Sequence, residues 1–400
     1  MGKDKISIES RIFGFSIWML LFTYEGSFMI QSLIGFIAIM FVVQMKKKCL
    51  KFGKYSKALL VLFFYLTFST VANTLIHIDL LSEAVVIGIL YFALITIWFW
   101  LNTNDTKNSR EINFIINNYI YVMTIVSIFS IYHGVILAQG GKIAYINFLG
   151  TEIDENYSSA LISMSVVFLF LKLIFLLNSN KKGIIKWIIL FVVNVIGVAV
   201  IGSRASMLSC ILAMVVGFCI YFGNKISLKK ILLCVILILF GIGIIKITLN
   251  YMPEWTYQRY FQNSYADKSN SIRLIYWKNA ITATLDSPLF GMGFGFYKKI
   301  PKYQEFEYFS ITPESAPAHQ TFLDIMIYGG FIGVSIFILF IGKILKNVFN
   351  RKNIMILPIV INLLFISNII GADRSVFFWN SLIIVVMLIE QKGNLKECFK

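Results

Sequence analysis

Long apolar runs, separated by short polar breaks, recur along the whole 400-residue chain. A helix needs about 20 predominantly apolar residues to cross the hydrocarbon core of a bilayer. Hydrophobic residues make up 58% of the chain and charged residues only 14%, whereas soluble domains carry about 25% charged residues. Because lipid cannot satisfy backbone hydrogen bonds, such runs fold as helices. The sequence therefore predicts an all-α integral membrane protein.

The runs predict about twelve transmembrane helices in a single polytopic domain that covers residues 1–400. The expected spans are 12–24, 28–45, 58–77, 84–101, 114–133, 158–178, 187–202, 205–222, 231–249, 319–341, 354–371 and 375–390. A polar stretch, residues 250–318, separates the ninth span from the tenth and is expected to contain short helices. Lys172 and Lys246 fall inside spans, near enough to helix ends for their ammonium groups to reach the interface.

The distribution of basic residues predicts an orientation. The net charge is +16, and most Lys and Arg lie in alternate short segments, such as residues 46–57. Outside the long loop, the segments on the opposite side hold few basic residues: Lys142, Arg204 and Arg374. Because cytoplasmic loops carry an excess of Lys and Arg, we expect both termini in the cytoplasm and residues 250–318 outside. Charge arranged in this way favours membrane topology, not nucleic acid, as its cause.

This topology gathers unusual polar residues from separate parts of the chain at the outer membrane surface. They are Asn156, Arg204, Arg273, His319 and Arg374. Binding and catalytic residues are concentrated on loops that a rigid scaffold positions. We therefore expect a functional site that faces outward.

Two arginines in this set are suited to anion binding. Arg204 follows Ser203 and begins an apolar helix, while Arg273 lies four residues before Trp277 in a segment with helical periodicity. Guanidinium groups bind phosphate oxygens in bidentate geometry, and a helix N-terminus beside Arg204 adds partial positive charge. The alternative is an interfacial role, in which Arg204 reaches the membrane surface and Arg273 meets lipid headgroups from a surface helix.

His319 is the histidine that adjoins the long polar loop, whereas His77 and His133 lie among apolar residues. Neighbouring cations disfavour the imidazolium form. A neutral imidazole can accept a proton from a hydroxyl group, so His319 is the candidate catalytic base; the alternative is a capping or interfacial histidine. Asp324 would lie about 140° around a helix from His319, and we do not expect it to orient the imidazole directly.

Other polar motifs favour structural roles. Glu152, Asp154 and Glu155 are able to hold a divalent cation, but acidic clusters are more often solvated loops, and Asn156 beside them predicts a helix N-cap or a sugar-binding amide. The spacing in Gly291-Met-Gly-Phe-Gly295 is wrong for a dinucleotide fingerprint. Its glycines are expected to let the backbone turn and approach another segment closely. We expect neither a metal nor a cofactor.

The motifs follow a characteristic order. Asn156 heads a mid-chain helix, Ser203-Arg204 opens another, Arg273-x3-Trp277 precedes Ser287-Pro-Leu-Phe-Gly291-Met-Gly293, and His319-Gln320 precedes Gly330-x2-Gly333. In this order the chain, over about residues 150–340, resembles the O-antigen ligase and polymerase superfamily of bacterial envelope glycosyltransferases. Gln320 stands where Asn is commoner in that family.

The resemblance implies a metal-independent, inverting glycosyltransferase with a GT-C-like helical fold in the cytoplasmic (inner) membrane. Its donor would be a glycan on undecaprenyl diphosphate, and its acceptor a sugar of lipid A-core or of a lipid-linked repeat unit. In this family Arg204 and Arg273 would hold the lipid diphosphate, and His319 would activate the acceptor hydroxyl. Further candidate substrate-binding residues are Asn156, Ser203, Trp277, Gln320 and Arg374.

The sequence leaves the choice between ligase and polymerase open, and it leaves one alternative class. A flippase for lipid-linked oligosaccharides would also have many spans, but we expect it to place charges along a path through the helices. Here the charged residues inside spans are nearly limited to Lys172, Lys246 and Asp324. Because the other polar residues gather at one face, an enzyme is favoured over a transporter.

Overall fold

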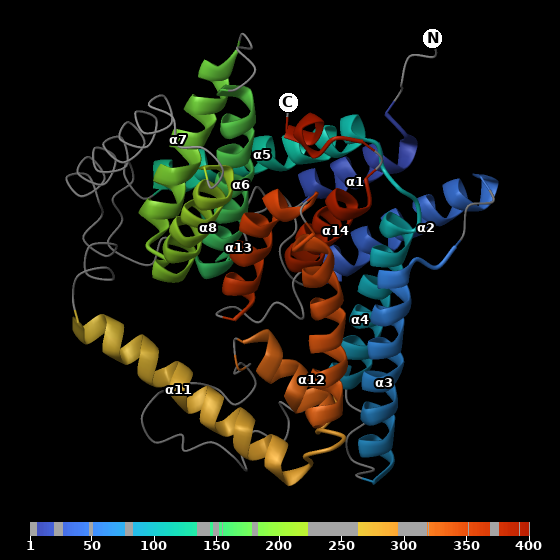
Figure 1. Ribbon diagram of the computed structural model, residues 1–400. Coiled ribbons are helices and arrows are strands. Elements are labelled where there is room, and N and C mark those ends of the chain that lie inside the picture. Colours follow the sequence, from blue (N-terminus) through green and yellow to red (C-terminus); the bar gives the residue numbers. More distant parts are fainter. Residues whose placement is uncertain are drawn as a thin grey trace.

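The computed structural model describes residues 6–19, 27–47, 51–76, 83–133, 145–146, 152–153, 155–177, 183–222, 263–294, 318, 320–350, 352–368, 376–391 and 393–399. In these parts the regular elements are helices, apart from one antiparallel pair of two-residue strands, β1 (Tyr145–Ile146) and β2 (Glu152–Ile153). Figure 1 shows most of the helices packed as one bundle, with both termini at the same end. The predicted helical class is confirmed, whereas the strand pair was not predicted.

The described residues up to 133 form five helices: α1 (Ile8–Trp18), α2 (Ser27–Lys47), α3 (Lys54–Ile76), α4 (Glu83–Thr103) and α5 (Ser109–Ile131). The start of α5 shows why its boundary falls where it does. The Asn108 side chain accepts a hydrogen bond from the Glu111 backbone N–H at 2.9 Å, and the Glu111 carboxylate accepts one from the Asn108 N–H at 3.1 Å. This reciprocal capping satisfies two backbone donors that a helix N-terminus leaves open.

Further along the described chain come the helices α6 (Glu155–Leu177), α7 (Ile184–Ile201) and α8 (Arg204–Phe222). They are followed by α11 (Asn263–Asp286), α12 (Thr321–Val348), the 3₁₀ turn η7 (Ile354–Ile356), α13 (Leu357–Ser367), α14 (Val376–Glu390) and a terminal 3₁₀ segment, η8 (Leu395–Phe399). In Figure 1, α11 is set apart from the bundle and runs obliquely from the side of α7 and α8 toward the foot of α12.

Within the described parts of the chain, seven helices are long and apolar enough to cross a membrane: α3, α4, α5, α6, α7, α8 and α12. The apolar helices α13 and α14 are shorter. Every expected span except 231–249 overlaps a described helix, and residues 231–249 lie outside the described residues. A multi-pass membrane protein is therefore supported, while the total of twelve spans and the GT-C-like arrangement stay predictions.

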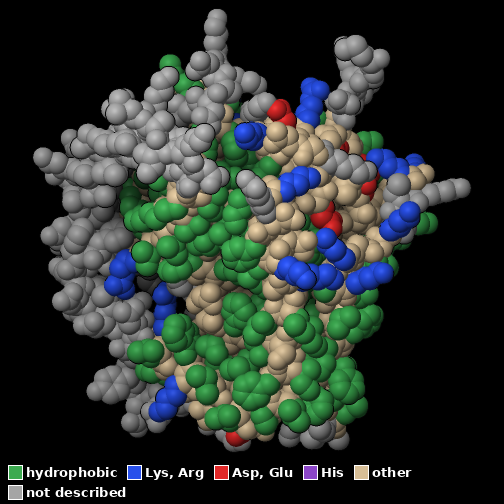
Figure 2. All heavy atoms as spheres, in the orientation of Figure 1, with side chains coloured by type: hydrophobic (Ala, Val, Ile, Leu, Met, Phe, Trp, Pro, Cys, Tyr) green, Lys and Arg blue, Asp and Glu red, His purple; other side chains and the backbone are tan. Residues whose placement is uncertain are grey.

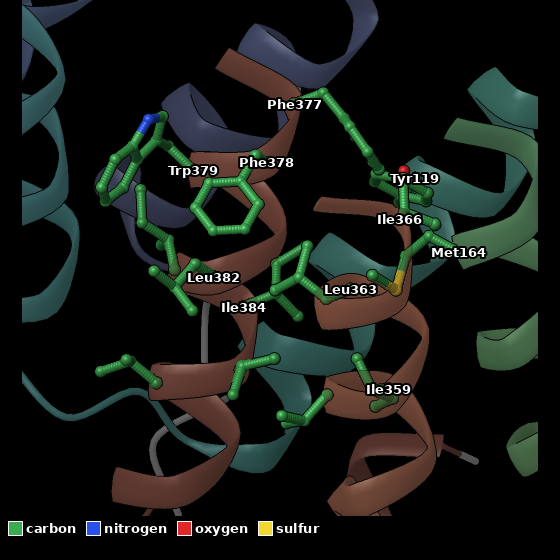
Figure 3. Close-up of a cluster of buried hydrophobic side chains, with 14 of the residues drawn as sticks. Tyr119, Met164, Ile359, Leu363, Ile366, Phe377, Phe378, Trp379, Leu382 and Ile384 are labelled. Carbon is green, nitrogen blue, oxygen red and sulfur yellow. The ribbon is translucent and has the colours of Figure 1, made fainter. Parts of the chain in front are cut away.

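Apolar side chains fill the space between α14, α13 and α5 (Figure 3). Trp379 of α14, Leu363 of α13 and Tyr119 of α5 are all nearly inaccessible to solvent. One polar contact crosses this core: the indole N–H of Trp98 donates to the Asn380 side-chain oxygen at 2.9 Å. Buried tryptophans usually find such a hydrogen-bond acceptor.

Lys172 corrects one expectation. Its side chain does not reach the membrane interface but is fully buried within α6. The ammonium donates to the side-chain oxygens of Asn113 at 3.0 Å and Asn117 at 2.9 Å, both on α5, and lies 4.2 Å from the ring centroid of Trp187 on α7. These neutral partners disperse the charge inside the bundle, so the lysine joins three helices. Lys246 lies outside the described residues.

The end of the bundle that carries the termini is rich in charged side chains. There Lys47 pairs with Glu9 at 2.6 Å, and Lys54 pairs with Glu390 at 3.6 Å. Figure 2 shows many of the Lys and Arg side chains of this face toward that end, with a broad hydrophobic surface below them. Such a surface is what lipid would cover in a membrane protein.

About a third of the way along, α12 is broken at Gly330, whose φ of 62° and ψ of −161° are not helical; Figure 1 shows its two parts meeting at a bend. An unbroken helix would pair the Ile327 carbonyl with the Phe331 N–H, four residues on. Instead the Ile327 carbonyl accepts from the Met292 N–H at 2.6 Å, and the Phe331 N–H donates to the Pro288 carbonyl at 2.7 Å. A neighbouring loop thus supplies the hydrogen bonds that lipid cannot provide.

Side chains of α3 complete this junction between residues 287–294 and α12. Three of these side chains, spaced one helical turn apart, donate hydrogen bonds of 2.9–3.0 Å to backbone carbonyls of the junction. Tyr65 donates to Leu289 and Gly329, Ser69 to Tyr328, and Asn73 to Gly291. Gly291 has a φ of 71°, and a Cβ atom there would lie 2.4 Å from the Gly330 nitrogen. The expected close approach of the glycine motif to another segment is confirmed.

Candidate functional site

The start of α12 holds one group of the predicted site residues. Gln320 is the N-cap of α12, and its side-chain oxygen accepts from the Leu323 backbone N–H. Its side-chain nitrogen donates to the Asn368 side-chain oxygen at 3.0 Å, at the end of α13. Gln320 therefore has a structural role that joins two helix ends, which the sequence did not indicate.

Ala318, which precedes His319 in the chain, is held on both sides of its backbone. The Trp277 indole N–H donates to the Ala318 carbonyl at 3.1 Å, and the Ala318 N–H donates to an Asp324 carboxylate oxygen at 3.1 Å. Ala318 and Asp324 are both buried. The structure thereby brings α11, which carries Arg273 and Trp277, to the residues around His319.

A second group lies where α6 begins and α7 turns into α8. Gly202 ends α7 with a φ of 78°, and this left-handed turn places Ser203 ahead of α8. The Ser203 hydroxyl donates to the Asn156 side-chain oxygen at 3.3 Å, and the Ser206 hydroxyl donates to Ser203 at 3.3 Å. The predicted residues Asn156 and Ser203 are thus in contact, directly beside Arg204.

α13 connects the two groups. Its Asn362 amide donates to the Ser209 hydroxyl of α8 at 3.0 Å, and its Asn362 oxygen accepts from the Ser163 hydroxyl of α6 at 3.4 Å. At the end of the same helix, Asn368 accepts from Gln320. Asn362 and Asn368 are six residues apart, which is about 9 Å along a helix. This short part of α13 therefore contacts both α6 and α8 at Asn362 and the start of α12 at Asn368.

The two arginines are carried by different elements. Arg204 begins α8, which packs on α6 and α13, whereas Arg273 lies on α11, which packs on α12. Both side chains are partly exposed. α11 begins at Asn263, ten residues before Arg273, and so is longer than the periodic segment that predicted it. Burial raises the pKa of the Tyr276 hydroxyl on the same helix above its ordinary value.

Two predicted site residues, His319 and Arg374, lie outside the described residues, as does Asp154 of the acidic cluster. Glu152 lies in β2 and Glu155 begins α6. Among the residues that the structure describes, no group of three or more His, Cys, Asp or Glu side chains is arranged to hold a metal ion.

Sequence reasoning missed two residues that hold the start of α12. Asn368 had no motif to mark it, and its contact with Gln320 joins positions 48 residues apart. The sequence argument about Asp324 assumed that residues 319 and 324 lie on one continuous helix, but α12 begins at Thr321. The expected angle between the two residues therefore does not apply. An N-capping Gln320 followed by an acidic residue in the first turn was the available signal.

Comparison with known families agrees with the order of the motifs. Residues 189–338 match the model of a family described as O-antigen ligase. The matched range contains Ser203, Arg204, Arg273, Trp277 and the sequence from His319 to Gly333, but neither Asn156 nor Arg374. No curated protein matches the chain significantly.

Proposed function

We propose that this chain belongs to the O-antigen ligase and polymerase superfamily, whose ligase model it matches over residues 189–338, and that it transfers a glycan from undecaprenyl diphosphate to an acceptor sugar at the outer face of the cytoplasmic membrane. The observation that carries the proposal is the hydrogen bond between Trp277 and Ala318. It joins the helix that carries Arg273 to Ala318, which precedes His319 in the chain. The proposed donor and acceptor rest on the family resemblance.

Arg204 and Arg273 are the proposed diphosphate-binding residues. Each guanidinium presents paired N–H donors that match phosphate oxygens. As the bond between sugar and diphosphate breaks, negative charge grows on the leaving oxygen, and fixed cations stabilise that charge. Two guanidinium groups suffice for a leaving group that is already stable as an anion, so the proposed chemistry needs no metal ion.

His319 is the proposed general base. Its neutral imidazole takes the proton of an acceptor hydroxyl while the hydroxyl oxygen attacks the anomeric carbon of the donor glycan. The new glycosidic C–O bond forms as the C–O bond to diphosphate breaks, and the diphosphate leaves with the bonding electrons. Attack opposite the leaving group inverts the anomeric configuration. Asn156, Ser203 and Arg374 remain proposed contacts to substrate.

The proposed orientation follows from charge. The end of the bundle with the termini carries Lys47 and Lys54 in its ion pairs, and cytoplasmic segments are enriched in such residues. If that end faces the cytoplasm, the start of α12 and α11 face outward, where lipid-linked glycans would be presented.

The proposal predicts that His319→Ala and Arg273→Ala each lower glycan transfer at least about a hundredfold, because they remove the base and one charge-stabilising group. The measurement is product formation by purified protein in detergent, with undecaprenyl-diphosphate-linked glycan as donor. His133→Ala and Lys278→Ala are matched controls, since they remove a histidine at the end of α5 and an exposed cation on α11. Wild-type transfer by both site variants would refute the site.

The same assay separates an enzyme from a flippase, because detergent leaves no bilayer to cross and a flippase would yield no product. Surface glycans of a deletion strain, resolved on a gel, separate the two enzymes. Acceptor carrying a single repeat unit indicates a lost polymerase. Bare acceptor with accumulated lipid-linked polymer indicates a lost ligase.

A further inference from the structure

Helix α8 turns its larger apolar side chains away from the bundle. Leu208, Ile211 and Val215 are 54%, 47% and 53% exposed, whereas Ser206 and Ser209 are buried, and the helix packs on α6 and α13. In lipid, an apolar side chain gains little by moving into a protein interior, so the hydrophobic effect does not set the rotation of such a helix about its own axis. Close packing of small residues and hydrogen bonds set it instead.

The hydrogen bonds of α8 come from a row of three serines at its start, three residues apart. The Ser203 hydroxyl donates to the Asn156 side-chain oxygen of α6 at 3.3 Å, and the Ser206 hydroxyl donates to Ser203 at 3.3 Å. The Ser209 hydroxyl donates to the Ser206 carbonyl at 2.8 Å and accepts from the Asn362 amide of α13 at 3.0 Å. The row is therefore held to α6 at one end and to α13 at the other.

Asn362 holds this row from inside the bundle. Its side chain is fully buried, and its oxygen accepts from the Ser163 hydroxyl of α6 at 3.4 Å. Burying an amide is unfavourable unless it is hydrogen-bonded, and here its bonds reach two other helices. Ser209 lies five residues after Arg204, about 7.5 Å along the axis of α8, so the contact with Asn362 lies close behind the arginine.

We infer that Asn362 and Ser209 are positioning residues for Arg204: their hydrogen bond fixes the rotation of α8, and with it the direction in which the guanidinium leaves the first turn. The inference rests on the proposed function, in which Arg204 binds the diphosphate. An atom about 6 Å from a helix axis moves by about 1 Å for each 10° of rotation. A misplacement of about 1 Å costs on the order of a hundredfold in rate.

The test is the double variant Asn362→Leu with Ser209→Ala in the detergent transfer assay. Both partners are removed together, so neither is left buried without the other, and the Ser163 hydroxyl keeps its bond to the Ala160 carbonyl at 2.7 Å. We expect kcat to fall at least about tenfold, with a melting temperature close to wild type. Ser209→Ala alone should give a smaller loss in the same direction, and it serves if the double variant fails to fold.

Asn380→Leu with Trp98→Phe is the matched control. It also removes both partners of a buried asparagine contact between helices, here α14 and α4, and neither residue lies on α6, α8 or α13. It should leave kcat close to wild type. Equal losses of kcat in the control and in the double variant of Asn362 and Ser209 would indicate a general loosening of the bundle and would overturn the positioning role.

Cys210 reports the rotation of α8 without any need for transfer. It follows Ser209, is 3% exposed, and its thiol donates to the Ser163 carbonyl at 3.6 Å. With Cys210 as the single cysteine, N-ethylmaleimide should label the otherwise intact protein slowly and the double variant several-fold faster. Cys219 on the same helix is exposed and, as the single cysteine, should label at the same rate in both. Unchanged labelling of Cys210 in the double variant would contradict the inference.

Arg204→Ala separates the two proposals. Residues that act through one another give losses that do not add, so adding the double variant to Arg204→Ala should lower kcat no further. A full additional loss there would show that Asn362 and Ser209 act on something other than Arg204, and would overturn the positioning role alone. Wild-type transfer by Arg204→Ala would instead refute the proposed diphosphate site, while the labelling of Cys210 would still test whether the hydrogen bond fixes α8.

Discussion

Lys172 illustrates how a single charged side chain can be accommodated inside an apolar bundle. Its ammonium contacts two asparagine oxygens and the face of an indole. Charged hydrogen bonds contribute more than neutral ones, and an indole face attracts a cation. The lysine therefore acts as a polar connection between α5, α6 and α7 at a depth where few such connections are available.

Lys172→Ala should destabilise the protein by about 2–5 kcal/mol, because it leaves a cavity and removes the donor for the oxygens of Asn113 and Asn117. The measurement is the free energy of unfolding of the purified protein in detergent. Lys186→Ala is the control, since Lys186 is exposed and bonds Tyr121 at 2.9 Å over the same Trp187 ring; its effect should stay below about 1 kcal/mol.

A triple variant, Lys172→Met with Asn113→Leu and Asn117→Leu, tests the cause. Replacing a whole buried polar group with apolar side chains is often neutral or stabilising. We expect the triple variant to be more stable than Lys172→Ala. Equal losses in the two would contradict this explanation, because the triple variant has neither the cavity nor the unbonded amides.

Among the helices, α12 shows most clearly how a local break can be stabilised by distant parts of the chain. The break at Gly330 leaves backbone groups that residues 287–294 and α3 satisfy. It separates a short first part, which begins at the cap beside His319, from a longer second part that packs on α3. The junction thus sets the direction in which the first part leaves the bundle.

Gly330→Ala is expected to destabilise the protein and to reduce transfer. Its φ of 62° is a conformation that costs a non-glycine residue about 1–3 kcal/mol, and its new Cβ would lie 2.5 Å from the Leu289 carbonyl carbon. Gly342→Ala, on the same helix, meets nothing within 4 Å and should be neutral or slightly stabilising. Thermal unfolding of both variants measures the difference; equal melting temperatures would contradict the junction's importance.

The spans were predictable because each helix satisfies its own backbone hydrogen bonds, so an apolar run is enough to specify it. The break in α12 was not predictable from the sequence, because it depends on side chains of α3 that lie more than two hundred residues earlier in the chain. The same holds for the site. Arg204, Arg273 and Trp277 are marked by residue type and spacing, whereas the Trp277–Ala318 and Gln320–Asn368 contacts exist only once the helices have packed.

At the scale of the bundle, the two ends differ in construction. At the end with the termini, η8 folds back so that Cys398 and Phe399 are completely buried. The Phe399 ring stacks on Phe175 of α6 with centroids 5.6 Å apart, and the Gln391 oxygen accepts from the Ser109 hydroxyl of α5 at 3.0 Å. The C-terminal segment is therefore part of the packed bundle at this end.

This packing predicts the reactivity of the terminal thiol. Burial raises the pKa of Cys398 to about 12, and only a thiolate reacts rapidly with a maleimide. In a variant with Cys398 as its single cysteine, we expect labelling at neutral pH to be very slow and to accelerate as the pH rises toward that value. Mass spectrometry measures the labelled fraction.

Two further variants define the result. Phe399→Ala should speed the labelling of Cys398, because it removes the ring that packs on α6. A cysteine introduced at the exposed Lys396 should label rapidly, and an impermeant reagent applied to inverted vesicles would at once test whether this end is cytoplasmic. Rapid labelling of Cys398 in the otherwise intact chain would show that η8 is not packed.

The three polar side chains of α3 that bond the α12 junction also constrain biosynthesis. Tyr65, Ser69 and Asn73 are made early, yet the carbonyls that they bond belong to residues 289–291 and 328–329. A ribosome must add more than two hundred further residues before those carbonyls exist. During that interval α3 is a membrane helix with an unfinished polar face, so the early intermediate depends on water or on the insertion machinery until the last third of the chain arrives.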